Sequence, residues 1–378
     1  MVTYPEGWKC DTITNIADIT TGCRDTQDNK VNGRYPFFVR SPIVERIDVA
    51  DFDCEAVLTA GDGVGTGKVF HYIDGKFAAH QRVYVMSNFQ DVDGKYFYYY
   101  FSNNFGKEVE KYTAKSSVDS VRRDMIAKME FPYPPLPEQK EIVQALLDFD
   151  EHIDNLTELI EKKKAIRDGA LEDLFSGRTR LDGFDGEWEE EPLQKICDIY
   201  DGTHQTPKYT VSGIKFVSVE NISDIYSSDK YISQADYDRD FKVRPEKGDV
   251  LMTRIGDIGT SCIVRTTEPI AYYVSLALFK EIAIDSEFLN HYIECKNFKK
   301  ELDDRTLHHA TPKKINKGEI GKCKVRYPKN EDEQKAIASI LTVMDEEIES
   351  LKVEKAKMIE IREGAMDDLL TGRVCLKV

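Results

Sequence analysis

Basic and hydroxyl side chains occur at matching positions in the two halves of this 378-residue chain. Arg122-Arg123 follows Lys115-Ser116-Ser117, and Lys313-Lys314 follows His308-His309-Ala310-Thr311. Cationic and hydroxyl groups contact the phosphates of nucleic acids, while Arg, Lys, Gln and His side chains also contact base edges. A solvated surface loop can contain the same residues, but their matched placement in both halves favours a pair of DNA contacts.

The glycine-rich segment Gly61–Lys68 has the composition of a phosphate-binding loop but not its spacing. The Walker pattern requires glycine where this chain has Asp62, and serine or threonine where it has Val69. The corresponding segment of the second half, Gly256–Thr260, contains no lysine. We therefore expect a tight connection between strands rather than a nucleotide-binding site.

The remaining polar residues form no pattern typical of catalysis. Tyr133–Leu136 lacks both ends of the Asn/Asp/Ser-Pro-Pro-Tyr/Phe motif of amino-methyltransferases. His308 and His309 are adjacent, whereas paired metal ligands on a helix are spaced i, i+4. We predict that the chain is not an enzyme and holds no metal or cofactor of its own.

The cysteines and the hydropathy pattern predict where the protein works. The eight cysteines are scattered without a CxxC pair, which fits reduced thiols better than a disulfide framework or a zinc site. No apolar run approaches the length of a membrane span, and Met1–Pro5 lacks the features of a signal peptide. We expect a soluble protein of the cytoplasm.

A long internal repeat predicts the elements that position the polar side chains. Residues 138–181 and 333–376 align without a gap at an offset of 195. In each copy apolar residues are spaced alternately four and three apart, the pattern of a coiled-coil seam. The sequence therefore predicts two long helices, each the natural partner of the other. The predicted seam contains Ile142, Leu146, Phe149, Ile153, Leu156 and Ile160 in the first copy and Ile337, Leu341, Met344, Ile348 and Leu351 in the second.

The carboxyl-terminal parts of these two helices contain further signals. Gly177 and Gly372 are expected to end them, and a rise of about 1.5 Å per residue makes each about 57 Å long. Toward these ends the seam positions become charged. Either the helix pairing shifts or splays there, or these ends dock on another protein. The charged seam positions are Lys163 and Arg167 in the first copy and Lys355 and Arg362 in the second.

The segments before the helices are related more weakly. Asp18–Gly22 corresponds to Asp198–Gly202, and the Gly61–Lys68 segment resembles Gly256–Thr260 with one residue removed. Around them, β-rich runs alternate with short helical stretches. The expected fold class is α+β, with two mixed domains that are each followed by a long helix. The expected boundaries are 1–136 for the first domain, 137–180 for the first helix, 181–330 for the second domain and 331–378 for the second helix.

The net charge of −16 ordinarily argues against a nucleic-acid partner, but its distribution matters more than its sum. Residues 138–175 hold 11 acidic and 5 basic side chains, and residues 331–370 hold 12 and 5, so the repeats account for −13. By contrast, residues 296–324 hold 9 Lys or Arg against 4 acids. The acidic side chains are therefore concentrated on the repeats, and locally basic stretches lie just before them.

Together these features resemble the specificity (S) subunit of type I restriction–modification enzymes. The resemblance is carried by Pro134–Ile142, by its echo at 330–337, and by the Leu-x-x-Gly-Arg helix ends Leu174–Arg178 and Leu369–Arg373. It covers essentially the whole chain. The second copy has Tyr327–Asn330 in place of the Pro-Pro-Leu-Pro lead-in, which leaves the start of its helix open.

The resemblance implies a non-catalytic subunit with two target recognition domains, each of which recognises one half of a split, non-palindromic DNA sequence. It further implies that the two helices pair as an antiparallel coiled coil and set the distance between the half-sites. Two methyltransferase subunits would dock on the helices and methylate adenine with S-adenosylmethionine. Restriction subunits would add translocation and cleavage that depend on ATP and Mg. No membrane partner is implied.

Polar and basic residues in corresponding loops are the predicted DNA contacts. In the first domain these are Arg24, Arg40, Thr66, Lys68, Gln81, Lys115, Ser116, Arg122 and Arg123. In the second domain they are His204, Lys208, Arg254, Thr260, Lys313 and Lys314.

Three other functions remain open from the sequence. The chain could serve a methyltransferase-only or fused-nuclease system, which its neighbouring genes would reveal. It could be a coiled-coil adaptor whose domains bind proteins, with no sequence-dependent affinity for DNA. It could also be a free-standing DNA-binding regulator, which would bind DNA tightly without partners.

Overall fold

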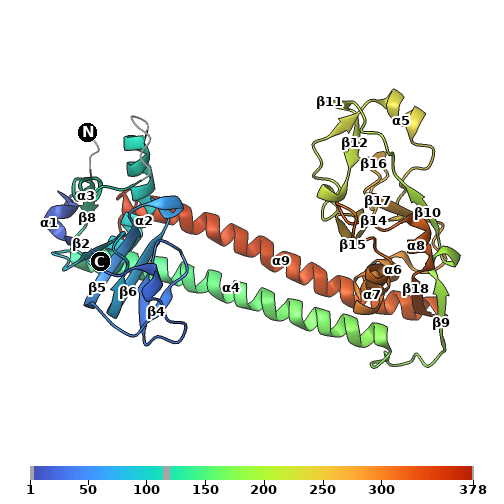
Figure 1. Cartoon of the computed structure of the whole chain (residues 1–378), viewed down its shortest axis with the longest axis horizontal. Coiled ribbons are helices and arrows are strands. Elements are labelled where there is room, and N and C mark those ends of the chain that lie inside the picture. The colour runs from blue at the N-terminus through green and yellow to red at the C-terminus, as the bar shows by residue number, and fades with distance from the viewer. Residues whose placement is uncertain (1–3, 114–119, 377–378) are drawn as a thin grey trace. The chain divides into compact units, whose positions relative to one another are not determined.

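The computed structural model describes residues 4–113 and 120–376, and the chain divides into two compact units. Unit 1 comprises Met1–Thr157 and Val353–Val378, and unit 2 comprises Glu158–Lys352. Each unit contains one globular domain and parts of both long helices (Figure 1). The fold class predicted from the sequence, two mixed domains each followed by a long helix, is confirmed.

The two long helices are α4 (Leu136–Ser176) and α9 (Glu331–Leu370). They contain 41 and 40 residues, so each is about 60 Å long at a rise of about 1.5 Å per residue. Their first residues are separated by the repeat offset of 195, and Asn330 caps α9 by accepting a hydrogen bond from the Asp332 N–H at 2.9 Å. An asparagine cap therefore replaces the proline-rich lead-in of α4. The predicted stripe is buried at Ile142, Leu146, Leu156, Ile160, Ile337, Leu341 and Ile348.

In unit 2 the two helices run antiparallel. Lys163 pairs with Glu347 at 2.6 Å and Arg167 pairs with Asp345 at 2.8 Å, so rising residue numbers on α4 meet falling numbers on α9. The side chain of Arg167 is only 10% exposed. The pairing therefore does not splay at Arg167, and this guanidinium is not free for another protein. Docking of the helix ends on another protein stays a prediction.

Unit 1 shows the same antiparallel pairing with the roles of the helices exchanged. Asp150 of α4 accepts a hydrogen bond from Arg362 of α9, and His152 lies 3.8 Å from Glu354. Arg362 is therefore also part of the seam. Among the described residues, three of the four charged seam residues therefore pair across the two helices: Lys163, Arg167 and Arg362.

A glycine lies just past the end of each long helix, as predicted: Gly177 directly follows α4, and Gly372 comes two residues after α9 ends at Leu370. Gly177 has a φ of +72° and Gly372 a φ of +73°, values in the left-handed region that residues with a Cβ rarely adopt. The Gly177 N–H donates to the Leu174 carbonyl at 3.2 Å and so satisfies one of the free carbonyls at the end of α4.

A six-stranded sheet in the order β2-β7-β5-β6-β3-β4 forms the centre of unit 1. Neighbouring strands are antiparallel, except that β3 and β6 are parallel. Helix α2 (Gly94–Thr113) packs on this sheet through a row of stacked rings, Phe97, Phe101 and Phe105, all fully buried. The strands are β2 (Asp18–Thr21), β3 (Tyr35–Phe38), β4 (Glu45–Ile47), β5 (Phe52–Ala60), β6 (Phe70–Ala79) and β7 (Val83–Ser87).

Short elements connect this sheet to α4. Strands β1 (Lys9–Thr12) and β8 (Glu130–Tyr133) pair antiparallel just before α4 begins. Val143 of α4 and Met366 of α9 belong to the same buried cluster as the rings of α2, so the helices complete the core of the domain. The remaining short elements are α1 (Ile13–Ile16), α3 (Arg123–Ala127), η1 (Thr26–Asp28) and η2 (Gly63–Gly65).

Unit 2 repeats this plan with its sheet divided into two. The sheets have the orders β10-β17-β14-β15 and β11-β13-β12-β16, and β9 pairs with β18 before α9 begins. The strands are β9 (Trp188–Pro192), β10 (Asp198–Asp201), β11 (Tyr209–Thr210), β12 (Ile214–Val217), β13 (Tyr231–Ile232), β14 (Val250–Ile255), β15 (Asp257–Ile263), β16 (Ile270–Tyr272), β17 (Leu276–Lys280) and β18 (Lys324–Pro328). The helices are η3 (Leu193–Lys195), η4 (Val219–Asn221), α5 (Gln234–Asp240), α6 (Ser286–Glu294), α7 (Lys296–Asp304) and α8 (Lys317–Lys322).

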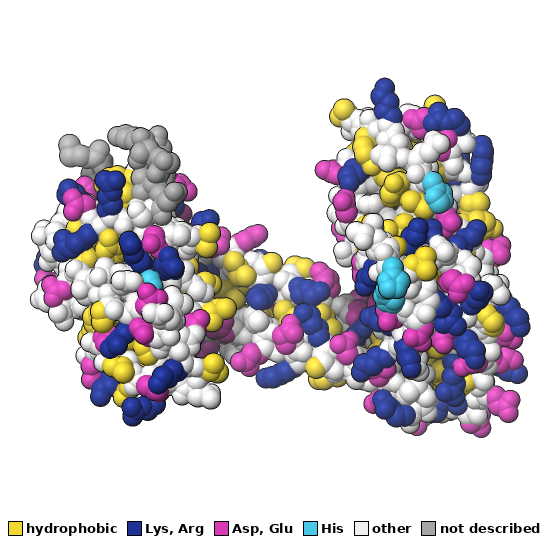
Figure 2. Space-filling view, viewed as in Figure 1, with side chains coloured by type: hydrophobic (Ala, Val, Ile, Leu, Met, Phe, Trp, Pro, Cys, Tyr) yellow, Lys and Arg dark blue, Asp and Glu magenta, His cyan; other side chains and the backbone are white. Residues whose placement is uncertain are grey.

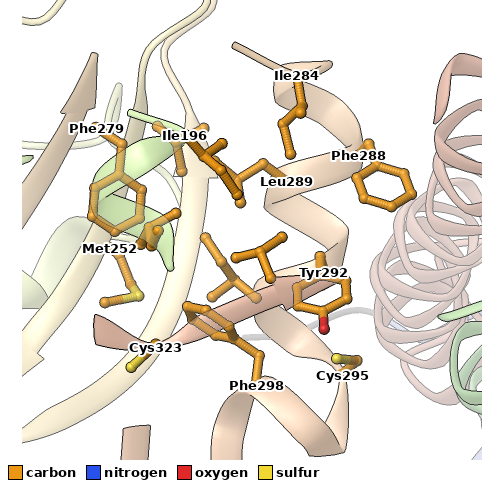
Figure 3. Packing of buried hydrophobic residues seen from close by; sticks show 14 of the residues in the cluster. Ile196, Met252, Phe279, Ile284, Phe288, Leu289, Tyr292, Cys295, Phe298 and Cys323 are labelled. Carbon is orange, nitrogen blue, oxygen red and sulfur yellow. The ribbon is translucent and has the colours of Figure 1, made fainter. Parts of the chain in front are cut away.

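The main core of unit 2 lies between its central sheet and helices α6 and α7. Figure 3 shows Met252 and Phe279 from the strands approaching Leu289 and Tyr292 of α6 and Phe298 of α7. These side chains are at most 4% exposed, and burying each stabilises the fold by about 1.5–3 kcal/mol. Residues of α4 and α9 belong to the same cluster, so this domain also requires both helices.

The weak correspondence between the two domains has a structural basis at one glycine. A Cβ added to Gly22, just after β2, would lie 2.0 Å from the Ala79 carbonyl oxygen. A Cβ added to Gly202, just after β10, would lie 2.4 Å from the Tyr272 carbonyl oxygen. Both domains therefore bring two backbone segments together at a point where only glycine fits.

The glutamine of the repeated Glu-Gln-Lys sequence fixes the start of each long helix. Gln139 is fully buried, and its Nε2 donates to the carbonyl oxygens of Asp91 at 2.9 Å and Pro134 at 2.8 Å. Its Oε1 accepts a hydrogen bond from the Asp93 N–H at 2.7 Å. Gln139 thereby ties the first turn of α4 to the start of α2.

Gln334 has the same role in unit 2. Its Nε2 donates to the Pro328 carbonyl at 2.7 Å, and its Oε1 accepts from the N–H of Asp285, the residue that caps α6. Because both glutamines are buried and satisfied by backbone groups, their repetition reflects a structural requirement rather than contact with a partner.

Candidate DNA interface

The glycine-rich connection of each domain lies against the basic pair predicted to contact DNA. In unit 1 the Val121 N–H donates to the Gly61 carbonyl at 2.7 Å, and Asp62 forms an antiparallel bridge with Ser120. Arg122 and Arg123 follow directly, and both are exposed. The fold thus joins two segments about sixty residues apart in the sequence.

Unit 2 makes the equivalent junction. The Gly256 N–H donates to the Lys313 carbonyl at 2.8 Å, and Ile255 forms an antiparallel bridge with Lys314. Lys313, Lys314 and Thr260 are all exposed. The matched placement seen in the sequence therefore corresponds to matched positions in the two folds.

Asp62, at the base of the glycine-rich connection of unit 1, interacts with two further basic side chains. Asp62 accepts a hydrogen bond from Arg40 Nη1 at 2.7 Å, and its other oxygen lies 3.8 Å from Arg82 Nε. The side chains of Arg40 and Arg82 are 45% and 65% exposed. Arg82 was missed by the sequence analysis, although it directly follows the predicted contact Gln81. Lys68 is exposed and forms no ion pair with any residue that the structure describes.

Arg24 is less accessible than predicted. Its Nε donates to Asp51 at 2.8 Å, and Nη2 binds the other oxygen of the same carboxylate. The hydrogen bond that Arg24 donates to Asp51 raises the pKa of Arg24 further above its ordinary value. Gln81 lies next to Arg24 and is exposed, with Nε2 3.3 Å from Asp25 Oδ2. Of these two, Gln81 is the better placed for an external contact.

Three other predicted residues of the first domain differ in outcome. The hydroxyl of Thr66 is buried and has no hydrogen-bond partner among the described residues, so it does not face solvent as expected. Lys115 and Ser116 lie outside the described residues, and their contacts stay predictions.

Arg254 is a correction to the predicted DNA contacts of the second domain. The residue is 5% exposed, and its guanidinium donates to Asp201 Oδ1 at 2.7 Å and to the Ile315 carbonyl at 3.1 Å. A guanidinium used in this way holds strands and loops of the domain together. It has no free face for a phosphate or a base.

His204 and Lys208 lie in the loop that follows β10, and both are exposed. The loop begins at Thr203, whose N–H donates to the Tyr272 carbonyl at 3.2 Å. On the visible face of unit 2, histidine and basic side chains occur close together (Figure 2). The loop therefore presents cations and hydrogen-bond donors to solvent.

Comparison with known proteins identifies the family of this chain. Residues 5–165 and 185–360 match the family described as type I restriction modification DNA specificity domain. The chain belongs to this family. Both target recognition domains of the specificity subunit are thus present, one in each matched segment. Specificity subunits are the non-catalytic DNA-recognition components of type I systems, which confirms the prediction that this chain is not an enzyme.

One named relative aligns over nearly the whole chain and another over part of it. The MjaVIII specificity subunit of Methanocaldococcus jannaschii is 25% identical over 409 aligned positions, covering 99% of this chain and 94% of that protein. The EcoDI specificity subunit of Escherichia coli is 29% identical over 161 aligned positions, which cover 43% of this chain and 34% of that protein.

A solved structure shares the fold. The crystal structure of the type I restriction–modification S subunit from M. genitalium superposes with a TM-score of 0.64 at 19% identity and covers 96% of each chain. Among the described residues of the present chain, no helix is long and apolar enough to cross a membrane.

Proposed function

We propose that this specificity subunit recognises the two halves of a split DNA sequence, one with each globular domain. The observation that carries the proposal is the junction present in both units, where a glycine-rich connection lies against an exposed basic pair. Arg122-Arg123 forms this pair in unit 1, and Lys313-Lys314 forms it in unit 2. Two equivalent cationic surfaces with different residues around them fit two half-sites of different sequence.

The residues around the two junctions support different base preferences. Arg40 and Arg82 border the first connection, and arginine is well suited to guanine in the major groove. In the second domain Arg254 is buried, whereas Thr260 and His204 are exposed to solvent. Because the exposed side chains differ, the site is non-palindromic in this proposal.

Helices α4 and α9 are the proposed docking surface for two methyltransferase subunits and for restriction subunits. Their acidic side chains repel phosphates, which favours a place off the DNA path. One structure of similar fold (TM-score 0.61, 16% identity) comes from work described as the complex assembly of a type I R-M system. In this proposal S-adenosylmethionine binds to the methyltransferase subunits, ATP and Mg bind to the restriction subunits, and the complex acts in the cytoplasm.

Mapping of adenine methylation across the host genome, with this gene intact and deleted, tests the proposal. One split motif should lose methylation in both half-sites when the gene is deleted, and the same data give the half-site sequences and the spacer. Exchange of the second domain for that of another specificity subunit should then change one half-site only. If the deletion changes no motif, or if the exchange changes both halves, the proposed division of labour is wrong.

A further inference from the structure

Val64 stands at the tip of the connection between β5 and β6 and is 98% exposed. The backbone that carries it is well fixed. The Thr66 N–H donates to the Gly63 carbonyl at 3.1 Å, and the Lys68 N–H donates to the Gly65 carbonyl at 3.0 Å. A Cβ at Gly65 would lie 2.6 Å from the Arg40 carbonyl oxygen, so the base of the tip is closely packed. The valine therefore projects from an ordered turn.

The fold does not explain why this residue is apolar. Its counterpart in the second domain is Ile258, which lies in β15 and packs against the main core of unit 2. Ile258 is apolar because the core requires it. Val64 contacts no core and pays the cost of an exposed isopropyl group in water without compensation inside the chain.

Basic side chains lie at the base of the turn that carries Val64. Arg40 and Arg82 are held by Asp62, one residue before the turn, and Arg122 and Arg123 follow the segment that pairs with Gly61. A partner that is anionic and also offers a small apolar group would complement this surface. Duplex DNA does both, because the C5 methyl group of thymine lies in the major groove between the phosphate backbones.

We propose that Val64 contacts the C5 methyl group of a thymine and thereby specifies one A·T pair in the half-site recognised by unit 1. The inference rests on the proposed function, since it requires that the first domain binds DNA in the major groove. It adds a specificity-determining residue that acts through an apolar contact, whereas all the contacts predicted from the sequence are polar.

Uracil lacks only the methyl group of thymine, so it tests the contact directly. The full chain, purified with its methyltransferase subunits, would be titrated with duplexes in which each thymine of the mapped site is replaced in turn by uracil. For the wild-type protein, one replacement should weaken binding about threefold to fivefold, the effect of one buried methyl group. Val64→Ala should weaken binding to the thymine duplex and should no longer distinguish thymine from uracil at that position.

Val31→Ala is the matched control. Val31 is 88% exposed in a different loop of the same domain, and its replacement should leave the thymine-to-uracil ratio at the wild-type value. Because both valines are exposed, neither substitution threatens folding. If Val64→Ala keeps the full sensitivity to uracil, if no thymine matters to the wild-type protein, or if the mapped half-site contains no A·T pair, the inference is wrong.

Failure of the proposed function gives a different result. In that case the wild-type complex binds specific and scrambled duplexes equally, and the uracil series is flat for that reason. Specific binding with a flat uracil series overturns only the assignment of Val64. A tip that enters the minor groove as a wedge also gives the second result, because that groove does not contain the methyl group.

Discussion

Arg167 of α4 binds Asp345 of α9 through two parallel hydrogen bonds, from Nε to Oδ1 at 2.8 Å and from Nη2 to Oδ2 at 3.0 Å. The pair has a counterpart in unit 1, where Arg362 donates to Asp150. Each member is the repeat equivalent of the corresponding residue in the other pair. Helix α4 thus supplies the arginine in unit 2 and the aspartate in unit 1, and α9 supplies the opposite residue in each unit. For this reason two copies of one helix sequence are complementary when they pair antiparallel.

Removal of Arg167 should destabilise unit 2 more than removal of Arg362 destabilises unit 1. The side chain of Arg167 is 10% exposed and that of Arg362 is 25% exposed. Arg167→Met should cost about 2 kcal/mol of unfolding free energy, because it leaves the carboxylates of Asp345 and Glu294 without their charged donor. Arg362→Met should cost about 1 kcal/mol, since water compensates more of the loss. Urea denaturation of the purified protein measures both.

The exchange Arg167→Asp with Asp345→Arg is the control for this seam. It restores the opposite charges of this pair but places a carboxylate beside Glu294, so it should recover only part of the stability that either single change removes. Additive losses in the double variant would show that the pair contributes nothing through its interaction.

Gln139→Leu should destabilise unit 1 by about 3 kcal/mol. Leucine has a similar volume but removes the partner of the Asp93 N–H and of the carbonyl oxygens of Asp91 and Pro134, the last of which is buried. Gln144→Leu is a suitable control, because Gln144 is exposed on the same helix and its side chain donates only to Asp148. Equal midpoints of chemical denaturation for the two variants would contradict a locking role for Gln139.

The stability of unit 2 should decrease when the pH falls below about 6.5, through His291. Burial lowers the pKa of His291 below its ordinary value of 6.5, so the unfolded chain takes up a proton that the folded chain resists. Nothing is lost above the unfolded pKa, and the loss grows as the pH falls toward the folded pKa. The charged groups around the imidazole are Asp345, Glu294 and Glu287, which favour protonation, and Arg167, which opposes it.

His291→Gln should reduce this pH dependence, since glutamine can still bond to Thr342, which lies 3.0 Å from His291 Nε2. Thermal unfolding at about pH 8 and about pH 5.5 gives the difference in midpoint. The exposed His152 provides the comparison through His152→Gln. An unchanged difference in the His291 variant would assign the pH dependence to other groups.

Arg122→Ala with Arg123→Ala should weaken binding of the complex to all DNA sequences. If both residues contact phosphates, the slope of log affinity against log salt should fall by about 2. If one contacts a base, the slope should fall by about 1 and one position of the site should become less specific. Filter binding over a range of salt concentrations distinguishes these outcomes.

Lys162→Ala with Lys164→Ala removes the same charge from α4, where the lysines pair with Glu158 and Glu161. This control should leave the salt slope unchanged. A slope that stays constant in the Arg122 and Arg123 variant would remove both residues from the interface.

The long helices could be predicted from sequence because their spacing is regular over many turns. The charged seam position Arg167 was misinterpreted because the sequence of each helix was considered without the residues that face it on the other helix. Arg167 looked unpaired until the antiparallel arrangement brought Asp345 beside it. The family resemblance already implied an antiparallel pair, but only the register of the two helices shows that Arg167 and Asp345 lie opposite each other.

The loops were less predictable, because strand pairing decides which side of the chain faces water. Arg254 and Arg40 are both arginines near a glycine-rich connection, yet the first is buried against Asp201 and the second is nearly half exposed. Composition alone does not separate them. Likewise, Val64 and Ile258 align in sequence, and only the structure shows that one of them has no core to fill.

The division of the chain also sets the order in which its parts can be completed during synthesis. Unit 2 is the continuous stretch Glu158–Lys352, whereas unit 1 needs Val353–Val378 in addition to Met1–Thr157. Leu369 and Leu370 of α9 belong to the core of the first domain. Because a chain leaves the ribosome from its amino end, the domain translated first is the last to acquire its full core. Until α9 has been synthesised, the apolar surface that Leu369 and Leu370 cover in the finished protein stays exposed to solvent or to other proteins.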